Sequence, residues 1–228
     1  MKNQTDMDTK LVYEFLNDLK ANNEREWFHA NKKRYKTALK EVETFLNQLI
    51  PEIKKFDKSI GVLAPKDCLF RIYRDIRFSK NKQPYKTNFG AVMARGGRKS
   101  PYAGYYIHFE PGSTFMGGGI WHPPSDVLKA VRKEIYFHAD EFKKIIQAKD
   151  FKKYFGEVSG DKLVRPPKDF PIDFPDIDLL KFKDYTAMHG VEDDLVHSDR
   201  FMDHALSVFK SMKPFNDFLN RGIDLKEE

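Results

Sequence analysis

The feature that most constrains the fold of this chain is a block of strand-like alternation enclosed between two blocks of helical periodicity. Over residues 102–110, apolar and polar side chains alternate with the period of two that is typical of a half-buried strand. One face of this strand would carry Tyr105, Ile107 and Phe109, and the other Tyr106, His108 and Glu110. Further strands are expected at 70–78, 87–95, 114–121 and 182–190. We therefore predict an α+β fold, with an antiparallel sheet of about four to five strands flanked by N-terminal and C-terminal helices.

The N-terminal block predicts a short amphipathic helix over 8–20 and then a long helix over 23–56. Asn23 and Glu26 have the spacing of a capping box at the start of the long helix. Pro51 would kink or restart that helix, because proline lacks the N–H that the helix needs.

The C-terminal block predicts one helix over 123–146, an irregular loop over 161–178, and a last helix that begins at Ser198 and ends at Pro214. No repeat or linker interrupts the chain. We expect a single domain over 1–228, helical over 8–57, mainly strand over 66–122 and mainly helical over 123–228.

Positive charge is concentrated in the stretch 66–88, where seven cations face two acids. Its net charge of +5 is nearly the whole of the chain's +6. The cations are Lys66, Arg71, Arg74, Arg77, Lys80, Lys82 and Lys86. Guanidinium groups match phosphate and carboxylate geometry, so this stretch predicts an anion-binding site.

Arg74 interrupts the alternation of the strand expected at 70–78, because it falls on the apolar face. It could pair with an acid inside the sheet, or a β-bulge could turn it toward Arg71 and Arg77. A polar loop over 79–84 follows. If that loop joins two antiparallel strands, Arg77 and Lys86 lie side by side, and an anion or an acid such as Glu110 should lie between them.

The predicted site combines the basic strand with the polar face of the strand at 102–110. Its ligand-binding candidates are Arg71, Tyr73, Arg74, Arg77, Lys80, Lys82, Lys86 and Tyr106. His108 and Glu110 are the catalytic candidates, because an imidazole and a carboxylate suit acid–base chemistry. The alternative is a solvated sheet face that is crossed by Arg–Glu pairs.

Other chemistries have weaker support. His108, Glu110 and His122 would form the ligand set of a non-haem iron site. A tight turn at 111–113 would, however, place His122 roughly 17 Å from His108, so we expect no metal. The run 117–119 of three glycines lacks the ending of a phosphate loop, and we expect it to make room for the rings of Tyr105 and Tyr106 or for a ligand. No sequence motif calls for a cofactor.

The single cysteine, Cys68, excludes an internal disulfide, fits a reducing cytoplasm and is expected to be a small buried residue. The polar N-terminus, through Asp8, is not typical of a signal peptide. No apolar run approaches the ~20 residues that span a bilayer, so we expect no membrane partner. The oligomeric state is left open.

Several motifs together resemble the family catalogued as domain of unknown function 2461, and the resemblance covers almost the whole chain. The matching stretches are Asn22–Phe28, Arg71–Ser79, Pro84–Asn88, Ala103–Tyr106, Gly118–Trp121 and Met212–Phe215. The resemblance implies a soluble single-domain protein and supplies no mechanism.

Three functions follow from these observations. The first is a site that binds a small anion carrying phosphate or carboxylate, and the protein could be an enzyme that acts on such a metabolite. The second is a nucleic-acid-binding module, indicated by a pI near 9.1 and by Tyr73, Phe78 and Tyr85 among the cations. The third is a non-catalytic scaffold, in which several charges of the arginine motif are buried in ion pairs.

Overall fold

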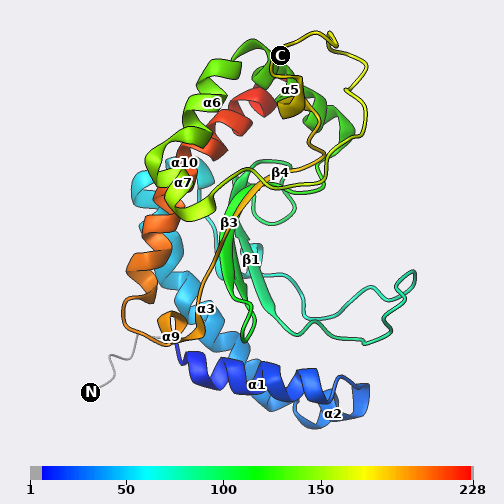
Figure 1. The fold of residues 1–228 in the computed structure, drawn as a ribbon. Coiled ribbons are helices and arrows are strands. Elements are labelled where there is room, and N and C mark those ends of the chain that lie inside the picture. Colours follow the sequence, from blue (N-terminus) through cyan, green and yellow to red (C-terminus); the bar gives the residue numbers. More distant parts are fainter. Residues whose placement is uncertain (1–6, 227–228) are drawn as a thin grey trace. The chain divides into compact units, whose positions relative to one another are not determined.

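A computed structural model describes residues 7–226 of the chain (Figure 1). The helices of these residues are α1 (Thr9–Ala21), α2 (Arg25–Ala30), α3 (Lys32–Phe56), the 3-10 helix η1 (Lys58–Ile60), α4 (Pro65–Cys68), α5 (Ser125–Phe137), α6 (Ala139–Gln147), α7 (Lys149–Phe155), α8 (Ile177–Leu180), α9 (Asp193–Val196) and α10 (Phe201–Asp224). The strands are β1 (Phe89–Met93), β2 (Gly104–Phe109), β3 (Phe115–Ile120) and β4 (Tyr185–Gly190). They form one antiparallel sheet in the order β1-β2-β3-β4, which confirms the predicted α+β class with helices at both termini.

The chain divides into two compact units. Among the described residues, unit 1 comprises 7–98, 106–116 and 190–206, and unit 2 comprises 99–105, 117–189 and 207–226. The prediction of a single domain stays a prediction. The absence of a signal peptide was predicted from residues 1–8, of which 1–6 lie outside the described residues.

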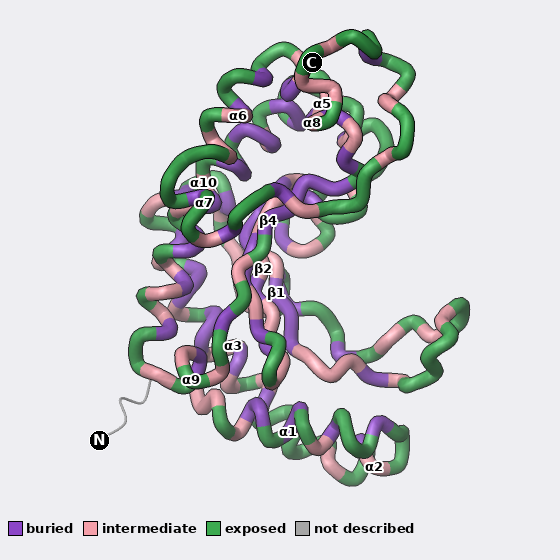
Figure 2. The backbone as a smooth tube through the Cα atoms, in the orientation of Figure 1, coloured by how far each residue is buried: buried purple, intermediate pink, exposed green. Residues whose placement is uncertain are grey.

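The core of unit 1 forms between the N-terminal helices and the apolar face of the strands. Asp8 begins α1 because its Oδ1 accepts the N–H of Leu11 at 3.1 Å. Helix α1 packs on α3, and α3 contacts β1. Phe45 of α3 meets Phe109 of β2 edge to face, with 5.6 Å between ring centroids. Figure 2 shows the buried positions recurring along α3 and the strands, as their periods require.

The long helix predicted over 23–56 is in fact two helices. The break falls at Asn31, whose Nδ2 donates to the carbonyl of Trp27 at 2.9 Å. Pro51 lies inside α3, which continues to Phe56, so the predicted restart at Pro51 is wrong. The capping box is also wrong: the residue before α2 is Glu24, and the Asn23 side chain instead bonds the backbone of Tyr85.

The strand predicted over 70–78 is not a regular strand. Within 70–88 the structure has one isolated bridge, Tyr73 with Tyr85, and a second bridge, Leu69 with Ala91, lies just outside; the segment forms the long teal loop in Figure 1. The N–H of Lys86 donates to the carbonyl of Ile72, so Lys86 faces Ile72 and the predicted pairing of Lys86 with Arg77 is wrong. Alternation predicts which side chains share a face, but it does not show that the backbone finds a partner along its whole length.

Unit 2 has a core of aromatic residues between short helices and the strand β4. The single helix predicted over 123–146 is broken at His138 and continues as α6, and a further helix, α7, follows Ala148. Phe142 of α6 contacts Phe215 and Phe218 of α10, with 5.9 and 5.0 Å between centroids. Helix α10 runs through Pro214 to Asp224, so the prediction that Pro214 ends it is wrong.

The three glycines of β3 make room for backbone, not for tyrosine rings. An added Cβ on Gly117 or Gly119 would overlap the carbonyl oxygens of Ala187 and Tyr185 in β4. An added Cβ on Gly118 would lie 2.5 Å from the carbonyl oxygen of Gly104. Strand β3 thus needs glycine for close strand contact, and the predicted role beside Tyr105 and Tyr106 is wrong.

Candidate functional site

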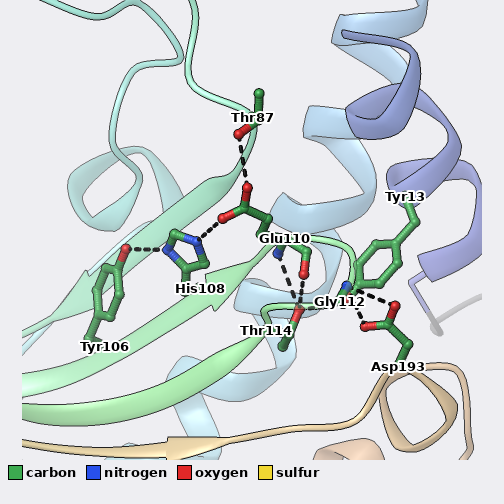
Figure 3. Close-up of polar contacts among 8 residues, drawn as sticks. All are labelled: Tyr13, Thr87, Tyr106, His108, Glu110, Gly112, Thr114 and Asp193. Carbon is green, nitrogen blue, oxygen red and sulfur yellow. Dashed lines mark hydrogen bonds and ion pairs between the residues drawn. The ribbon is translucent and has the colours of Figure 1, made fainter. Parts of the chain in front are cut away.

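A row of three polar side chains lies along the outward face of β2 and its end, within unit 1 (Figure 3). The hydroxyl of Tyr106 lies 2.9 Å from Nδ1 of His108, and Nε2 of His108 lies 3.1 Å from Oε2 of Glu110. Successive members are two residues apart, so the period of the strand itself places them on one face. The side chains of His108 and Glu110 are 12% and 22% exposed.

The partners fix the direction of each hydrogen bond. A carboxylate only accepts, so Nε2 of neutral His108 carries the proton that is donated to Glu110. Nδ1 is then an acceptor, and the hydroxyl of Tyr106 donates to it. The other oxygen of Glu110 accepts the hydroxyl of Thr87 at 2.9 Å. The row is therefore an ordered hydroxyl–imidazole–carboxylate relay.

A second set of bonds holds the turn that follows Glu110 (Figure 3). Oγ1 of Thr114 donates to the carbonyl of Glu110 at 3.1 Å and accepts its N–H at 3.2 Å. The hydroxyl of Tyr13 also bonds this oxygen. Oδ2 of Asp193 accepts the N–H of Gly112 at 2.9 Å. These contacts keep the backbone of Glu110 in place independently of its side chain.

Burial sets the protonation states of the row at neutral pH. It raises the pKa of Tyr106 to about 12, and the nearby charge of Glu110 acts in the same direction. Burial also lowers the pKa of His108 below its usual 6.5, and this outweighs the raising effect of Glu110. The phenol is thus protonated and the imidazole neutral, as the direction of the bonds requires.

Neighbouring side chains frame the relay. The ring of Phe115 on β3 stacks on His108 at 4.6 Å, with an interplanar angle of 18°. An added Cβ on Gly90 of β1 would lie 2.6 Å from the hydroxyl oxygen of Tyr106, so only glycine lets that hydroxyl reach His108 undisturbed. Thr87, Gly90 and Phe115 were not among the site residues predicted from the sequence. Glycine inside a strand does indicate a close approach, but the sequence does not show which side chain comes close.

Lys86 lies beside the relay, and the charge of Arg71 acts on Lys86. Nζ of Lys86 is 5.2 Å from the ring centroid of Phe70, and that ring contacts Tyr106, with 6.5 Å between centroids. Burial, followed by the charge of Arg71, lowers the pKa of Lys86, and the charge of Lys86 in turn contributes to lowering the pKa of His108. Within the described part of the chain, neither Lys86 nor Arg71 forms an ion pair with a carboxylate, although the charge of Arg71 contributes to lowering the pKa of Asp75.

Arg77 and Arg74 of the predicted site bond groups of their own loop and not the relay. Arg77 pairs with Asp75 through two hydrogen bonds of 3.0 and 2.7 Å, and this lowers the pKa of Asp75 to about 2, so the expected partner Glu110 is wrong. Arg74 donates to the carbonyl of Gln83 and to Oγ of Ser79, which is neither of its two predicted arrangements.

Lys82 donates to the carbonyl of Ile76, and Lys80 is exposed. Tyr73 is 48% exposed and contacts the rings of Phe28 and Tyr85. Of the ten predicted site residues, the structure therefore groups five by contact or charge: Arg71, Lys86, Tyr106, His108 and Glu110.

Two further residue sets bear on chemistry. Between residues 7 and 226, no three His, Cys, Asp or Glu side chains are grouped so that they could hold a metal ion. Cys68 is fully buried, and burial raises the pKa of its thiol to about 11, so its predicted role as a small buried residue is confirmed. No helix in the described part of the chain is long and apolar enough to cross a membrane.

The fold and the row on β2 define an α+β protein with a polar relay on one sheet face. Residues 12–218 match the family model described as "Conserved hypothetical protein (DUF2461)", and the chain belongs to this family. No curated protein and no solved structure matches the chain.

Proposed function

We propose that this protein binds a small anion, carrying phosphate or carboxylate, at Lys86 and Arg71, and that His108 and Glu110 provide acid–base chemistry beside it. The observation that carries the proposal is the pair of cations. Arg71 is close enough for its charge to lower the pKa of Lys86, and neither cation forms an ion pair with a described carboxylate; the acid that the charge of Arg71 reaches, Asp75, is already bonded to Arg77. A bound anion would relieve this repulsion.

The contrast with Arg77 supports this location. Arg77 is already neutralised by Asp75 in a two-bond pair, so an anion gains less by binding there. Lys86 is also less exposed than the cations of the loop, which strengthens its attraction for an anion because water screens it less.

Isothermal titration with inorganic phosphate and a panel of phosphorylated and carboxylated metabolites tests the proposal. We expect Arg71→Ala and Lys86→Ala each to weaken binding about tenfold, the range for one lost charge-assisted contact. Arg77→Ala is the matched control, because it removes an arginine from the same stretch, and it should change affinity little. Equal affinities for the wild type, Arg71→Ala and Lys86→Ala would refute the site.

A second candidate is binding of single-stranded nucleic acid by the exposed loop. The ring of Phe78 is 95% exposed, the guanidinium of Arg77 lies 5.8 Å from its centroid, and Lys80 and Lys82 are exposed nearby in sequence. Aromatic rings between cations stack on bases and bind phosphates. Filter binding of an oligonucleotide should weaken with salt and with Phe78→Ala, but not with Phe137→Ala, which removes another exposed phenylalanine. No binding at low salt would exclude this candidate.

The scaffold alternative expects buried ion pairs in the arginine motif. The pair Arg77–Asp75 is instead largely exposed, with side-chain exposures of 76% and 46%, so it is not the buried pair that a scaffold role expects. We further propose a cytoplasmic location, because a single buried cysteine fits a reducing compartment.

A further inference from the structure

The relay on β2 has the order of groups that activates a hydroxyl nucleophile. In such an arrangement a hydroxyl donates to an imidazole, and a carboxylate holds the imidazole in the tautomer that can accept the proton. Tyr106, His108 and Glu110 occupy these three places, at 2.9 and 3.1 Å. Thr87 orients the carboxylate in turn.

We propose that Tyr106 is a nucleophile that attacks the phosphorus of a phosphate monoester. The inference rests on the proposed function, because Lys86 and Arg71 would hold the phosphate. His108 acts as the base, and Glu110 is a positioning residue that acts through His108.

The electrons and protons balance in two steps. In the first, Oη of Tyr106 forms a bond to phosphorus, its proton passes to Nδ1 of His108, and the ester P–O bond breaks. The proton then moves from His108 to the leaving oxygen, which departs as an alcohol. In the second step His108 takes a proton from water, the hydroxide displaces Tyr106 from phosphorus, and His108 returns the proton to Oη. The net reaction is hydrolysis to alcohol and phosphate.

Several features fit these roles. Neutral His108 can accept a proton at neutral pH, because burial lowers its pKa. The pKa of Tyr106 is about 12, so its hydroxyl needs a base to become reactive. Lys86 and Arg71 would offset the charge that develops on the phosphoryl oxygens. Gly90 gives the hydroxyl the room that it needs to reach Nδ1.

The test uses 4-(fluorosulfonyl)benzoate, which joins a carboxylate to a tetrahedral sulfur electrophile. Attack by Tyr106 would form a sulfonate ester, release fluoride and pass the phenol proton to His108. We expect mass spectrometry to find one adduct, on Tyr106, with none in Tyr106→Phe. His108→Gln should slow labelling about tenfold or more, the size of a lost general base. Tyr73→Phe, which removes an exposed tyrosine outside the relay, should not.

The pH profile of labelling separates an activated tyrosine from an ordinary one. With His108 as the base, the rate should level off once the imidazole is neutral, near or below pH 6.5. A rate that keeps rising from neutral pH toward the pKa of Tyr106 would show an unassisted phenol and overturn the inference. Adducts on other residues, or equal rates in the wild type and in His108→Gln, would overturn it as well. Glu110→Gln should also slow labelling, and this variant tests the relay in place of His108→Gln if His108→Gln does not fold.

Two further arms distinguish this inference from the anion site. Neutral benzenesulfonyl fluoride is the second probe, because it carries no carboxylate. If the anion site is wrong and the relay is right, Arg71→Ala and inorganic phosphate leave labelling by the anionic probe unchanged, while His108→Gln still slows the labelling of Tyr106 by the neutral probe. If the relay is wrong, His108→Gln has no effect on either probe. Phenyl phosphate should protect Tyr106 from the anionic probe, and a lack of protection would overturn the assigned substrate class.

Discussion

The most direct test of the fold around the site is the substitution Asn23→Ala. Nδ2 of Asn23 donates to the carbonyl of Tyr85 at 3.0 Å, and Oδ1 accepts the N–H of Tyr85 at 3.1 Å. Asn23 is 8% exposed and Tyr85 is 3% exposed. The amide takes the place of a neighbouring strand for Tyr85, whose chain continues into Lys86 and Thr87.

The expected cost follows from this geometry. Asn23→Ala leaves a backbone N–H and a backbone carbonyl of Tyr85 without partners, at about 1–3 kcal/mol for each buried group. Water that enters the space left by the side chain would recover part of this. We therefore expect the free energy of unfolding to fall by about 2–4 kcal/mol.

Urea denaturation measures this loss, and Asn22→Ala is the matched control. Nδ2 of Asn22 makes one exposed hydrogen bond, to the carbonyl of Asp18 at 2.9 Å. Its loss should cost about 0.5–1 kcal/mol. If Asn23→Ala costs no more than Asn22→Ala, the two bonds to Tyr85 do not support the fold and the reasoning fails.

Two further predictions concern charge. Because burial lowers the pKa of His108, the unfolded chain binds more protons than the folded protein as the pH falls through about 6.5, so the free energy of unfolding should drop. Urea denaturation at several pH values measures this drop, which should be smaller in His108→Gln. Equal drops in the wild type and in His108→Gln would contradict the prediction. Arg221 bonds the buried carboxylate of Glu134, so Arg221→Met should lower the free energy of unfolding, measured by urea denaturation, by about 2 kcal/mol or more. The control Lys226→Met breaks an exposed pair with Asp126 and should cost less than about 1 kcal/mol; equal costs would show that the burial of Glu134 is unimportant.

Local pattern was enough to predict the fold class and the three polar residues that share one face of β2 and its end. The alternation around Ile107 placed Tyr106, His108 and Glu110 on one face, and β2 has that face. It also predicted helices at both ends of the chain. These predictions hold because a strand or helix repeats its own geometry, whatever it packs against.

Pattern failed where a segment depends on a distant partner. Lys86 was expected beside Arg77, but its N–H bonds the carbonyl of Ile72, 14 residues away. Asn23 was expected to cap a helix and bonds Tyr85, 62 residues away. Pro214 was expected to end a helix that continues to Asp224, because the aromatic core of unit 2 holds the part that follows the proline through Phe215 and Phe218.

The sequence by itself therefore determined the α+β class, the concentration of positive charge in 66–88, and the order of the three groups on β2. Only the tertiary structure decided that Thr87 orients Glu110, that Gly90 leaves room for the hydroxyl of Tyr106, and that Arg71 lies close enough to Lys86 for its charge to lower the pKa of Lys86. The physical reason is that periodicity acts within a few residues, whereas hydrogen bonds, close contacts and ion pairs depend on which distant segments the folded chain brings together.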